Sequence, residues 1–340
     1  MPWINQEYKY SCFQKLAMSV LKQGVIPSHV SFIMDGNRRH ATAQGLQKTE
    51  GHRQGFSKLS EVSAVVIFIT KVLRWCYDFG IKEVSVYAFS IENFKRSERE
   101  VSFLMDLALV KLSDLVQKKN ELDKHGVRVR VLGNLRLLPI KVQRAAARLM
   151  LLTSENTRAT LNILMPYTTR DELTSALNAI RRGVQAGILE EEDISPEVID
   201  RSSQLRGCRP LDLLVRTSGE VRLSDFMLWQ ASRSAALFSF FEVNWPTFSF
   251  WHLTIAILHF QLNRVALLPL PEAVRCHLSG LDPHNTVNGH SGIHQPVIID
   301  VVVEENRKRR LEEFYAKLEK EYMDELFEMA NLPEVDETAA

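Results

Sequence analysis

The residues with the clearest chemical potential form one short run in the sequence, Asp35-Gly36-Asn37-Arg38-Arg39. This run brings together a carboxylate, an amide and two guanidinium groups, and Gly36 lacks the Cβ that would hold a ligand away from the backbone. The apolar residues directly before the run predict a buried strand, and ligands of open α/β sheets bind beyond the carboxyl ends of strands. A simple turn, in which Asp35 or Asn37 caps a helix, is the alternative that this run alone leaves open.

Two further polar clusters follow other predicted strands. Ser90 to Arg96 comes after the apolar segment from Ile81 to Phe89, and Arg216 to Ser224 comes after the segment from Leu211 to Val215. Because the carboxyl ends of parallel strands lie at one edge of a sheet, we expect the three clusters to converge there.

The converging clusters are rich in arginine, whose planar guanidinium group binds phosphate oxygens in pairs. The guanidinium groups are those of Arg38, Arg39, Arg96, Arg216 and Arg222. They exceed what a single phosphate needs, so we expect two polyanionic substrates. A lone carboxylate among them, that of Asp35, suits Mg²⁺, which prefers one or two carboxylates together with phosphate oxygens.

Several common phosphate-binding and nucleophilic arrangements are missing from the sequence. It contains neither a Walker A sequence nor a GxGxxG dinucleotide fingerprint, and no Ser-His-Asp set is evident. A Mg²⁺-dependent phosphohydrolase is disfavoured because no second aspartate stands two residues from Asp35. The remaining chemistry is a diphosphate that acts as a leaving group beside apolar walls.

Composition restricts the cellular setting. The 340 residues carry a net charge of +1, which gives no electrostatic case for nucleic-acid binding. The cysteines are widely spaced without a CxxC pair, which argues against a zinc site or a disulfide framework and suits a reducing compartment. Neither a membrane-spanning apolar run nor a signal peptide is evident, so we expect a cytosolic protein or one peripheral to a membrane.

Strand and helix signals alternate along the chain, which predicts an α/β fold with a central, mostly parallel six-stranded sheet flanked by helices. The predicted strands cover Val30–Met34, Ile81–Phe89, Val127–Leu132, Ala159–Met165, Leu211–Val215 and Ala236–Phe241. The predicted helices include Glu98–Lys124, Pro139–Leu152, Thr169–Val184, a short helix from Ser195, and a helix that follows Trp245-Pro246 and ends near Arg264. Ser224 or Asp225 is a candidate start for another helix, whose N-terminus would favour anions.

Four segments stand apart from this alternating pattern. Residues 1–27 contain an amphipathic helix that either lies on a membrane surface or packs on its own domain. Residues 62–72 form an unusual β-branched, apolar insertion. Residues 266–303 are expected to be a linker or insertion. Residues 304–340 are expected to form a charged C-terminal helix and tail, which is either solvated or binds a partner.

Several of these segments together resemble the motif set of the cis-prenyltransferases, over about residues 28 to 264. The matching segments are Ile33-Met34-Asp35-Gly36-Asn37-Arg38-Arg39, Gly51-His52, Tyr87-Ala88-Phe89-Ser90-Ile91-Glu92-Asn93-Phe94-Lys95-Arg96 and Arg216-Thr217-Ser218-Gly219-Glu220-Val221-Arg222-Leu223-Ser224. The resemblance implies that residues 28–265 are the catalytic domain and that an apolar tunnel between sheet and helices holds the growing chain.

The implied reaction condenses isopentenyl diphosphate repeatedly onto farnesyl diphosphate with cis double bonds. Its product would be a long-chain polyprenyl (dehydrodolichyl) diphosphate for dolichol synthesis and protein glycosylation. Asp35 would hold Mg²⁺, and the resemblance implies catalytic roles for Asp35, Asn37, Ser90 and Asn93. The allylic diphosphate would be bound by Gly36, Asn37, Arg38, Arg39, Lys48, His52 and Arg96. Isopentenyl diphosphate would be bound by Arg216, Arg222 and Ser224.

The sequence departs from the family pattern in ways that imply a partner. Lys48 stands where the family usually has an arginine; it keeps the positive charge but lacks the planar guanidinium group that binds two phosphate oxygens. Ala236 replaces a glutamate that assists metal binding in bacterial members, and the tail lacks their Arg-x-Gly motif. A Nogo-B-receptor-like partner subunit would supply that motif in a dimer or higher heteromer, peripheral to the cytosolic face of the endoplasmic reticulum membrane. A non-catalytic subunit of the same heteromer is the alternative function.

The segment from Val62 to Val72 is about ten residues longer than the family's helix allows. An insert of that length would turn the face that follows it by about −80° at the ~100° per residue of an α-helix. We therefore predict that the insert loops out, or is a retained non-coding segment, and that deleting residues 62–71 preserves or restores activity. Large loss of folding on deletion would contradict this prediction.

Overall fold

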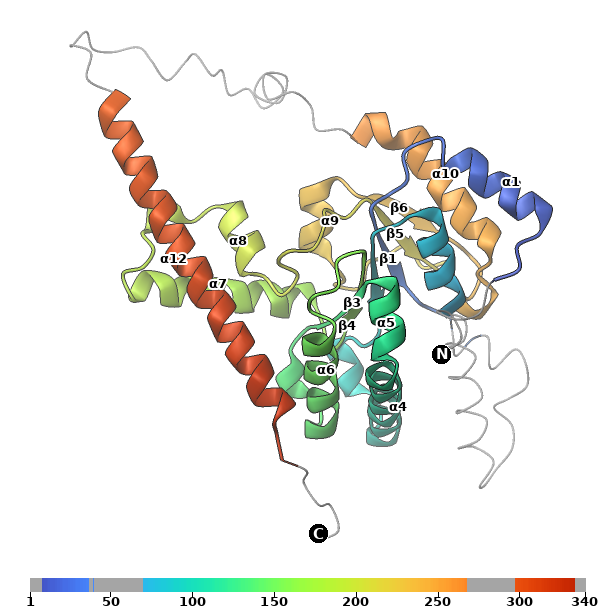
Figure 1. The fold of residues 1–340 in the computed structure, drawn as a ribbon, viewed down its shortest axis with the longest axis horizontal. Coiled ribbons are helices and arrows are strands. Elements are labelled where there is room, and N and C mark those ends of the chain that lie inside the picture. The colour runs from blue at the N-terminus through green and yellow to red at the C-terminus, as the bar shows by residue number, and fades with distance from the viewer. Residues whose placement is uncertain (1–7, 37–38, 40–69, 268–296, 334–340) are drawn as a thin grey trace.

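The computed structural model describes residues 8–36, Arg39, residues 70–267 and residues 297–333. Its centre is a six-stranded sheet in the order β3-β4-β2-β1-β5-β6 (Figure 1). The strands are β1 (His29–Ile33), β2 (Glu83–Tyr87), β3 (Val127–Leu132), β4 (Ala159–Leu164), β5 (Leu213–Arg216) and β6 (Leu237–Phe240). All neighbouring strands pair in parallel, which confirms the predicted sheet.

Helices cover the sheet and extend beyond it. The described α-helices are α1 (Cys12–Leu21), a helix over residues 70–79, α4 (Glu98–Gln117), α5 (Lys119–His125), α6 (Ile140–Leu152), α7 (Thr169–Gln185), α8 (Pro196–Ser202), α9 (Leu228–Ser234), α10 (Phe250–Leu267) and α12 (Val297–Ala330). Short 3-10 helices are η1 (Ile91–Lys95), η2 (Leu135–Leu137), η3 (Glu191–Asp193) and η4 (Trp245–Thr247).

The two faces of the sheet pack differently because side chains alternate along each strand. On β1, Val30 and Phe32 join a large apolar core with residues of the 70–79 helix, α4, α6 and α10. Ile33 points to the opposite face, which a smaller core covers with Phe226 and residues of α9. Helices on both faces are what a parallel sheet requires, since neither face can be left in water.

Several predicted boundaries differ from the structure. The predicted helix from Glu98 to Lys124 is two helices, because the backbone leaves the helical region at Lys118 (φ −96°, ψ 21°). The helix proposed to open at Ser224 or Asp225 is wrong: α9 begins at Leu228, and both residues have positive φ, of 52° and 58°. Such angles are unfavourable for side-chain-bearing residues and end regular structure there.

The segments outside the alternating pattern are partly described. In α1, a capping box between Ser11 and Gln14 starts the helix, and its last turn contacts α10 through Gln261, whose Nε2 donates to the Leu21 carbonyl (2.7 Å). Residues 62–69 lie outside the described residues, but Thr70 and Val72 are buried, so the end of the predicted insertion belongs to a core helix.

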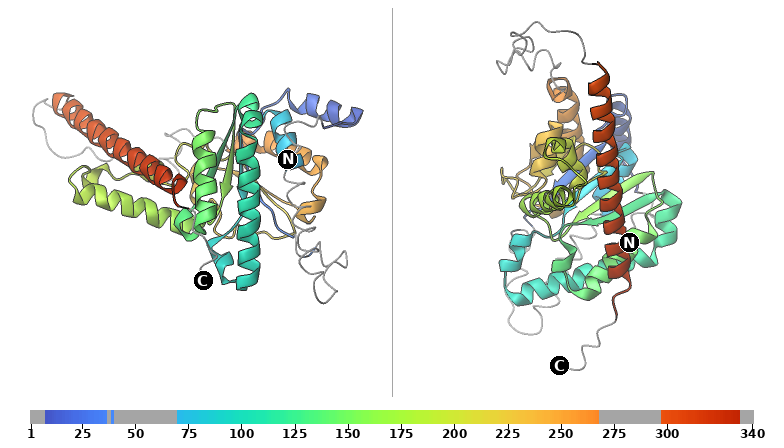
Figure 2. Two further views of the ribbon diagram at one scale, coloured as in Figure 1. Left: turned by 60° about the horizontal axis from the view of Figure 1, so that its bottom comes forward. Right: turned by 90° about the vertical axis from the view of Figure 1, so that its left-hand side faces the viewer.

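The C-terminal helix α12 starts at Val297, inside the predicted linker, and α10 continues to Leu267. Figure 2 shows α12 lying along the body of the protein, where it packs on α6 and α8. Phe314 is buried in this contact, and the Arg310 guanidinium pairs with Asp193 at 2.8 Å. A helix with mixed charges is therefore packed on its own chain through an apolar stripe and ion pairs.

Candidate active site

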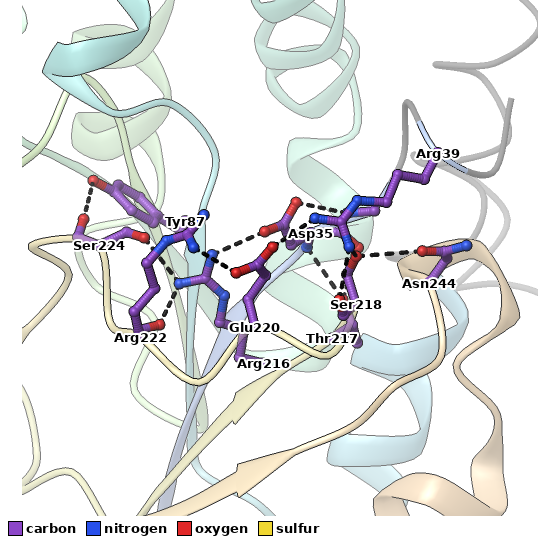
Figure 3. Close-up of polar contacts among 11 residues, drawn as sticks. Asp35, Arg39, Tyr87, Arg216, Thr217, Ser218, Glu220, Arg222, Ser224 and Asn244 are labelled. Carbon is purple, nitrogen blue, oxygen red and sulfur yellow. Dashed lines mark hydrogen bonds and ion pairs between the residues drawn. The ribbon is translucent and has the colours of Figure 1, made fainter. Parts of the chain in front are cut away.

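The carboxyl ends of the neighbouring strands β1 and β5 are joined by side chains. Their register pairs Ile33 with Arg216, the last residue of β5. The Asp35 N–H donates to Thr217 Oγ1 (3.1 Å), and that hydroxyl donates to the Asp35 carbonyl (2.8 Å). This exchange fixes where the Asp35 side chain begins, and Figure 3 shows the polar groups that surround it.

Among the residues that the structure describes, the Asp35 carboxylate accepts one hydrogen bond on each oxygen. The Gly36 N–H donates to Oδ1 (2.7 Å), and the Arg216 guanidinium donates to Oδ2 (2.8 Å). Partial burial alone would raise the pKa of Asp35, but these hydrogen bonds and the charges of Arg216 and Arg39 lower it below its ordinary value. The carboxylate is therefore charged at neutral pH, and 36% of the side chain remains accessible to solvent.

The Arg216 guanidinium connects this carboxylate to the loop that follows β5. Only 3% of its side chain is exposed. Besides Asp35, it donates to Ser224 Oγ (2.9 Å) and to the Arg222 carbonyl. The loop bends back over the strand end to offer these oxygens, and positive φ angles at Ser218 (78°) and Ser224 (52°) accompany the bend. Strained backbone of this kind is typical of ligand-binding loops.

Two exposed arginines are bridged by a glutamate beside this buried pair. Arg39 donates to the carbonyl and hydroxyl oxygens of Ser218, both at 2.9 Å. It also donates to Glu220 Oε1 (2.5 Å), while Arg222 donates to the other oxygen of Glu220. The bridge lowers the pKa of Glu220, chiefly through the hydrogen bond from Arg39.

The turn at Gly36 is buttressed by the loop between β6 and α10. Gly36 has φ +92°, and a Cβ there would lie 2.3 Å from Asn244 Oδ1. The Trp245 N–H donates to the Asp35 carbonyl (3.0 Å), so the loop also holds the main chain of Asp35. Only glycine fits this turn, because any side chain would meet both an unfavourable φ and a neighbouring amide.

The third predicted cluster, at the end of β2, is held mainly by local contacts. The Ser90 N–H donates to Asn93 Oδ1 (3.0 Å) in a capping box that starts η1. Arg96 pairs with Glu100 (2.8 Å), four residues further on. Tyr87 provides the link to the β5 loop, since its hydroxyl lies 3.1 Å from the Tyr167 carbonyl and 3.3 Å from the Ser224 carbonyl. Burial raises the pKa of Tyr87 to about 12, so the hydroxyl remains a hydrogen-bond donor.

Residues 33–266 match a prenyltransferase family described as "Putative undecaprenyl diphosphate synthase". The chain belongs to this family. It is 45% identical over 267 residues to the dehydrodolichyl diphosphate synthase complex subunit of Homo sapiens. This match covers 78% of this chain and 76% of the relative. It is 37% identical over 250 residues to the dehydrodolichyl diphosphate synthase complex subunit of Schizosaccharomyces pombe. That match covers 74% of this chain and 90% of the relative.

The fold agrees with a solved member of the family. The crystal structure of lavandulyl diphosphate synthase from Lavandula x intermedia, in complex with dimethylallyl diphosphate, matches with a TM-score of 0.61. The two sequences are 27% identical, and the match covers 69% of this chain and 95% of the other. The chain is therefore a prenyl-transferring enzyme of the cis-prenyltransferase type, and the predicted family, fold and enzyme class are confirmed.

The structure of this prenyltransferase brings together part of the predicted site. Asp35, Gly36, Arg39, Arg216, Arg222 and Ser224 converge at the ends of β1 and β5. Asn37, Arg38, Lys48 and His52 lie outside the described residues. Ser90, Asn93 and Arg96 follow the next strand end, β2, where the Asn93 and Arg96 side chains contact residues of the same segment.

Several residues that contact the predicted site residues are not predicted individually from the sequence. Thr217, Ser218, Glu220 and Tyr87 stand inside quoted motifs, and their hydroxyl and carboxylate groups were the available signal. Asn244 had no such signal, because its contact with the Gly36 turn crosses from a different loop.

The donor set at Asp35 fits a magnesium ion that is shared with a diphosphate. From the described residues, each carboxylate oxygen accepts one hydrogen bond, which leaves a lone pair for a cation. Among the described residues, no group of three or more His, Cys, Asp or Glu side chains could hold a metal by itself. A single protein carboxylate completed by phosphate oxygens and water is a coordination that Mg²⁺ accepts.

Proposed function

We propose that this enzyme condenses isopentenyl diphosphate repeatedly onto farnesyl diphosphate, with cis double bonds, to give a long-chain polyprenyl diphosphate for dolichol synthesis. The observation that carries the proposal is the 2.8 Å contact between Asp35 and the buried Arg216 guanidinium. It joins the loop after β1 to the end of the neighbouring strand β5, so that groups suited to two diphosphates lie on either side of one ion pair.

The allylic diphosphate is assigned to the β1 side of this pair. Arg39 is exposed and reaches across to Ser218, so its guanidinium is placed at the open side of the Gly36 turn. Asn37, Arg38, Lys48 and His52 are assigned to the same diphosphate through the family motifs, and Arg96 through the end of β2. The Gly36 turn matters here because it lets the backbone N–H groups come close to phosphate oxygens.

Isopentenyl diphosphate is assigned to the β5 side. Arg222 is exposed, Arg216 is aimed at the centre, and Ser224 presents its hydroxyl to the same guanidinium. Because Arg216 is already fixed by Asp35 and Ser224, little conformational entropy is lost when it donates to a phosphate oxygen. This preorganisation favours binding of the second diphosphate close to the first.

The reaction breaks the allylic C–O bond, whose electron pair leaves with the diphosphate. The alkene of isopentenyl diphosphate forms the new C–C bond, and a proton is then lost. Asp35 would hold Mg²⁺, which neutralises charge on the departing diphosphate when it is bound. The arginines bind and orient both diphosphates, and Ser90 and Asn93 are assigned to positioning and to the proton path. Most of the rate would come from positioning and electrostatic stabilisation.

A heteromer and membrane contact complete the proposal. The relatives from Homo sapiens and Schizosaccharomyces pombe are named as complex subunits. In this chain the position equivalent to the bacterial metal-assisting glutamate is Ala236, which is buried and offers no carboxylate. Phe238 and Phe240 are exposed on β6, the edge strand, and suit a Nogo-B-receptor-like partner subunit that completes the site.

Membrane contact is assigned to α1. Phe13, Leu16 and Val20 lie at helical spacing and are exposed, as an interfacial helix requires. No helix in the described part of the chain is long and apolar enough to cross a bilayer. We place the enzyme peripherally on the cytosolic face of the endoplasmic reticulum.

The deciding assay supplies farnesyl diphosphate, labelled isopentenyl diphosphate and Mg²⁺, with and without the partner subunit. We expect labelled long-chain product that depends on Mg²⁺, and its loss in Asp35→Ala. Asp114→Ala is the matched control, because Asp114 is a partly exposed aspartate on α4 that forms a 3.6 Å ion pair with Lys111. Absence of product even with the partner would favour a non-catalytic subunit, and full activity in Asp35→Ala would overturn the assigned site.

Membrane contact has a separate test. Flotation with liposomes should fall in a Phe13→Ser, Leu16→Ser variant of the full chain. Leu177→Ser is the control, because Leu177 is an exposed apolar residue on α7. Unchanged flotation of the α1 variant would remove the assignment.

A further inference from the structure

One carboxylate bridges two arginines that the proposed function assigns to different diphosphates. Glu220 accepts from Arg39 on one oxygen, at 2.5 Å, and from Arg222 on the other. Figure 3 shows the Glu220 side chain lying in the middle of the site, next to the Asp35–Arg216 pair. Arg39 follows β1 in the sequence, whereas Glu220 and Arg222 lie in the loop after β5. The bridge therefore spans both proposed binding sites.

The charges of this bridge resemble those that a diphosphate would supply. A carboxylate oxygen of Glu220 accepts hydrogen bonds from a guanidinium group in the same way as a phosphate oxygen that binds arginine. Glu220 accepts from one nitrogen of each guanidinium group at the same time, so a diphosphate that binds through the same N–H groups competes with an oxygen of Glu220. The carboxylate is thus a competitor that is built into the chain.

The exposure of the three side chains shows that the bridge can open. The side chains of Arg39 and Arg222 are 58% and 66% exposed, and that of Glu220 is 22% exposed. Exposed ion pairs contribute little to stability, so a diphosphate with more charge can replace them. The Asp35–Arg216 pair differs because its guanidinium is buried and has further partners. Opening the Glu220 bridge therefore leaves the centre of the site intact.

We propose that Glu220 acts as an internal competitor that clears diphosphate from both sites between successive condensations, an inference that rests on the proposed function. Each condensation leaves inorganic diphosphate at the allylic site and a longer diphosphate product at the isopentenyl site. Both must leave before the next cycle. Glu220 takes back Arg39 as the first departs and Arg222 as the second departs, which lowers the free-energy cost of release.

The competitor role and a purely structural role predict opposite signs. If Glu220 competes with ligand, its neutralisation frees both arginines, and diphosphate binds more tightly. If Glu220 only holds the two arginines in place, its loss lets them disperse, and diphosphate binds more weakly. The sign of the change in affinity separates the two roles, whatever its size.

The test measures binding of inorganic pyrophosphate by calorimetry to the full chain, with the partner subunit when it is required for activity. We expect Glu220→Gln to bind pyrophosphate about 2- to 30-fold more tightly than the wild type, the range that two exposed ion pairs allow. The variant should also show stronger product inhibition by pyrophosphate and slower multiple turnover than the wild type.

The control is Glu197→Gln, because Glu197 makes an exposed 2.9 Å ion pair with Arg233 away from the site. It should leave pyrophosphate affinity unchanged. Thermal unfolding of both variants verifies that they fold. Unchanged or weaker pyrophosphate binding in Glu220→Gln would overturn the competitor role while leaving the assigned sites standing. If the wild type itself binds no pyrophosphate, the proposed function fails and the competitor role fails with it.

Discussion

Two polar networks cross the same sheet, one open to solvent and one closed. The open network surrounds Asp35 and Arg216 at the carboxyl ends of β1 and β5 (Figure 3). The closed network lies within the sheet: His29 Nε2 lies 2.8 Å from Ser85 Oγ, and the Asn162 amide donates to Glu83 (2.6 Å) and to Ser85 (3.1 Å). All four side chains of the closed network are buried.

The two networks use similar chemistry for different purposes. In the closed network, Glu83 accepts from the Arg209 N–H (2.9 Å), and the Arg209 carbonyl lies 2.8 Å from His29 Nδ1. These bonds hold the segment that leads into β5. The open network leaves exposed arginines and a partly exposed carboxylate beside strained backbone. The comparison teaches that a polar cluster serves a ligand only where binding capacity remains available to solvent.

The largest expected effect is at the centre of the open network. Arg216→Lys keeps the charge but cannot reach Asp35, Ser224 and the Arg222 carbonyl together, because an ammonium group lacks the planar fork. We expect kcat/KM to fall by roughly 10²–10³-fold, the loss typical of removing a preorganised electrostatic group. Steady-state kinetics with both substrates gives the measurement.

Stability should change less than activity in this variant. The free energy of unfolding should fall by about 1–2 kcal/mol, as expected for lost hydrogen bonds to a charged group. Arg233→Lys is the control, since the exposed Arg233 pairs with Glu197 and Asp200 outside the site. Equal loss of activity in Arg216→Lys and Arg233→Lys would show that Arg216 is no more important for activity than an arginine on the surface.

The next largest effect is expected in the closed network, and on stability. Asn162→Leu leaves Glu83 and Ser85 without the donor that the Asn162 amide supplies. A buried carboxylate that loses a donor costs about 2–4 kcal/mol. Chemical denaturation should show this loss, whereas kcat/KM of the folded enzyme should stay close to the wild-type value.

Asn331→Leu provides a matched control for this substitution. The exposed side-chain amide of Asn331 donates to the Phe327 carbonyl near the end of α12. Its replacement should cost much less stability. A large drop in kcat/KM of folded Asn162→Leu would show that the closed network also serves catalysis, and the proposed division between the networks would be lost.

The sequence predicted the open network better than the closed one for a physical reason. Asp35 and Arg216 follow apolar strands directly, and the rule that ligands bind at strand ends places them together. His29, Glu83 and Asn162 stand inside strands, where a polar residue is ordinarily assigned to a solvated face. Their burial depends on the 203–212 segment covering that face, and such tertiary contacts leave no local pattern in the sequence.

The remaining misses have a similar origin. The capping of η1 by Ser90 and Asn93 is local, so strand-end reasoning located these residues without revealing that they bind each other. The Asn244 contact joins loops far apart in the chain. The start of α12 at Val297 was missed because the segment before it is rich in residues that favour turns, and the predicted linker therefore extended to residue 303.

A smaller effect is expected at the turn that supports the open network. Gly36→Ala must accommodate a Cβ 2.3 Å from Asn244 Oδ1 at a φ of +92°. We expect a loss of about 1–3 kcal/mol in the free energy of unfolding, together with a fall in kcat/KM as the Asp35 carboxylate is displaced. Thermal unfolding and the prenyl-transfer assay measure the two effects.

Gly187→Ala separates backbone strain from the clash. Gly187 has φ +69°, but a Cβ there would have no neighbour within 4 Å among the residues that the structure describes. It should lose stability from strain alone and retain full activity. If Gly36→Ala loses no more than Gly187→Ala, the contact with Asn244 does not constrain the turn. If the contact with Asn244 does constrain the turn, adding Asn244→Ala to Gly36→Ala should recover part of the lost stability.

The smallest effect, a pH dependence of stability, belongs to His29 in the closed network. Burial lowers the pKa of His29 below its ordinary value of 6.5, although the charge of Glu83 acts in the opposite direction. The Arg209 carbonyl can only accept, so Nδ1 carries the proton and Nε2 accepts from the Ser85 hydroxyl. The neutral ring therefore fills its place in the network without a charge.

The sign of the pH dependence follows from the protons bound in each state. Below pH 6.5 the unfolded chain protonates His29 while the folded chain does not, until the pH reaches the lower folded pKa. Stability should therefore fall as the pH decreases from 6.5, with a slope of at most ~1.4 kcal/mol per pH unit. In His29→Gln this component disappears, so the difference in unfolding free energy between wild type and variant should shrink as the pH falls. A difference that stays constant with pH would show that the closed network accommodates a charged imidazole, and that it is less closed than its burial indicates.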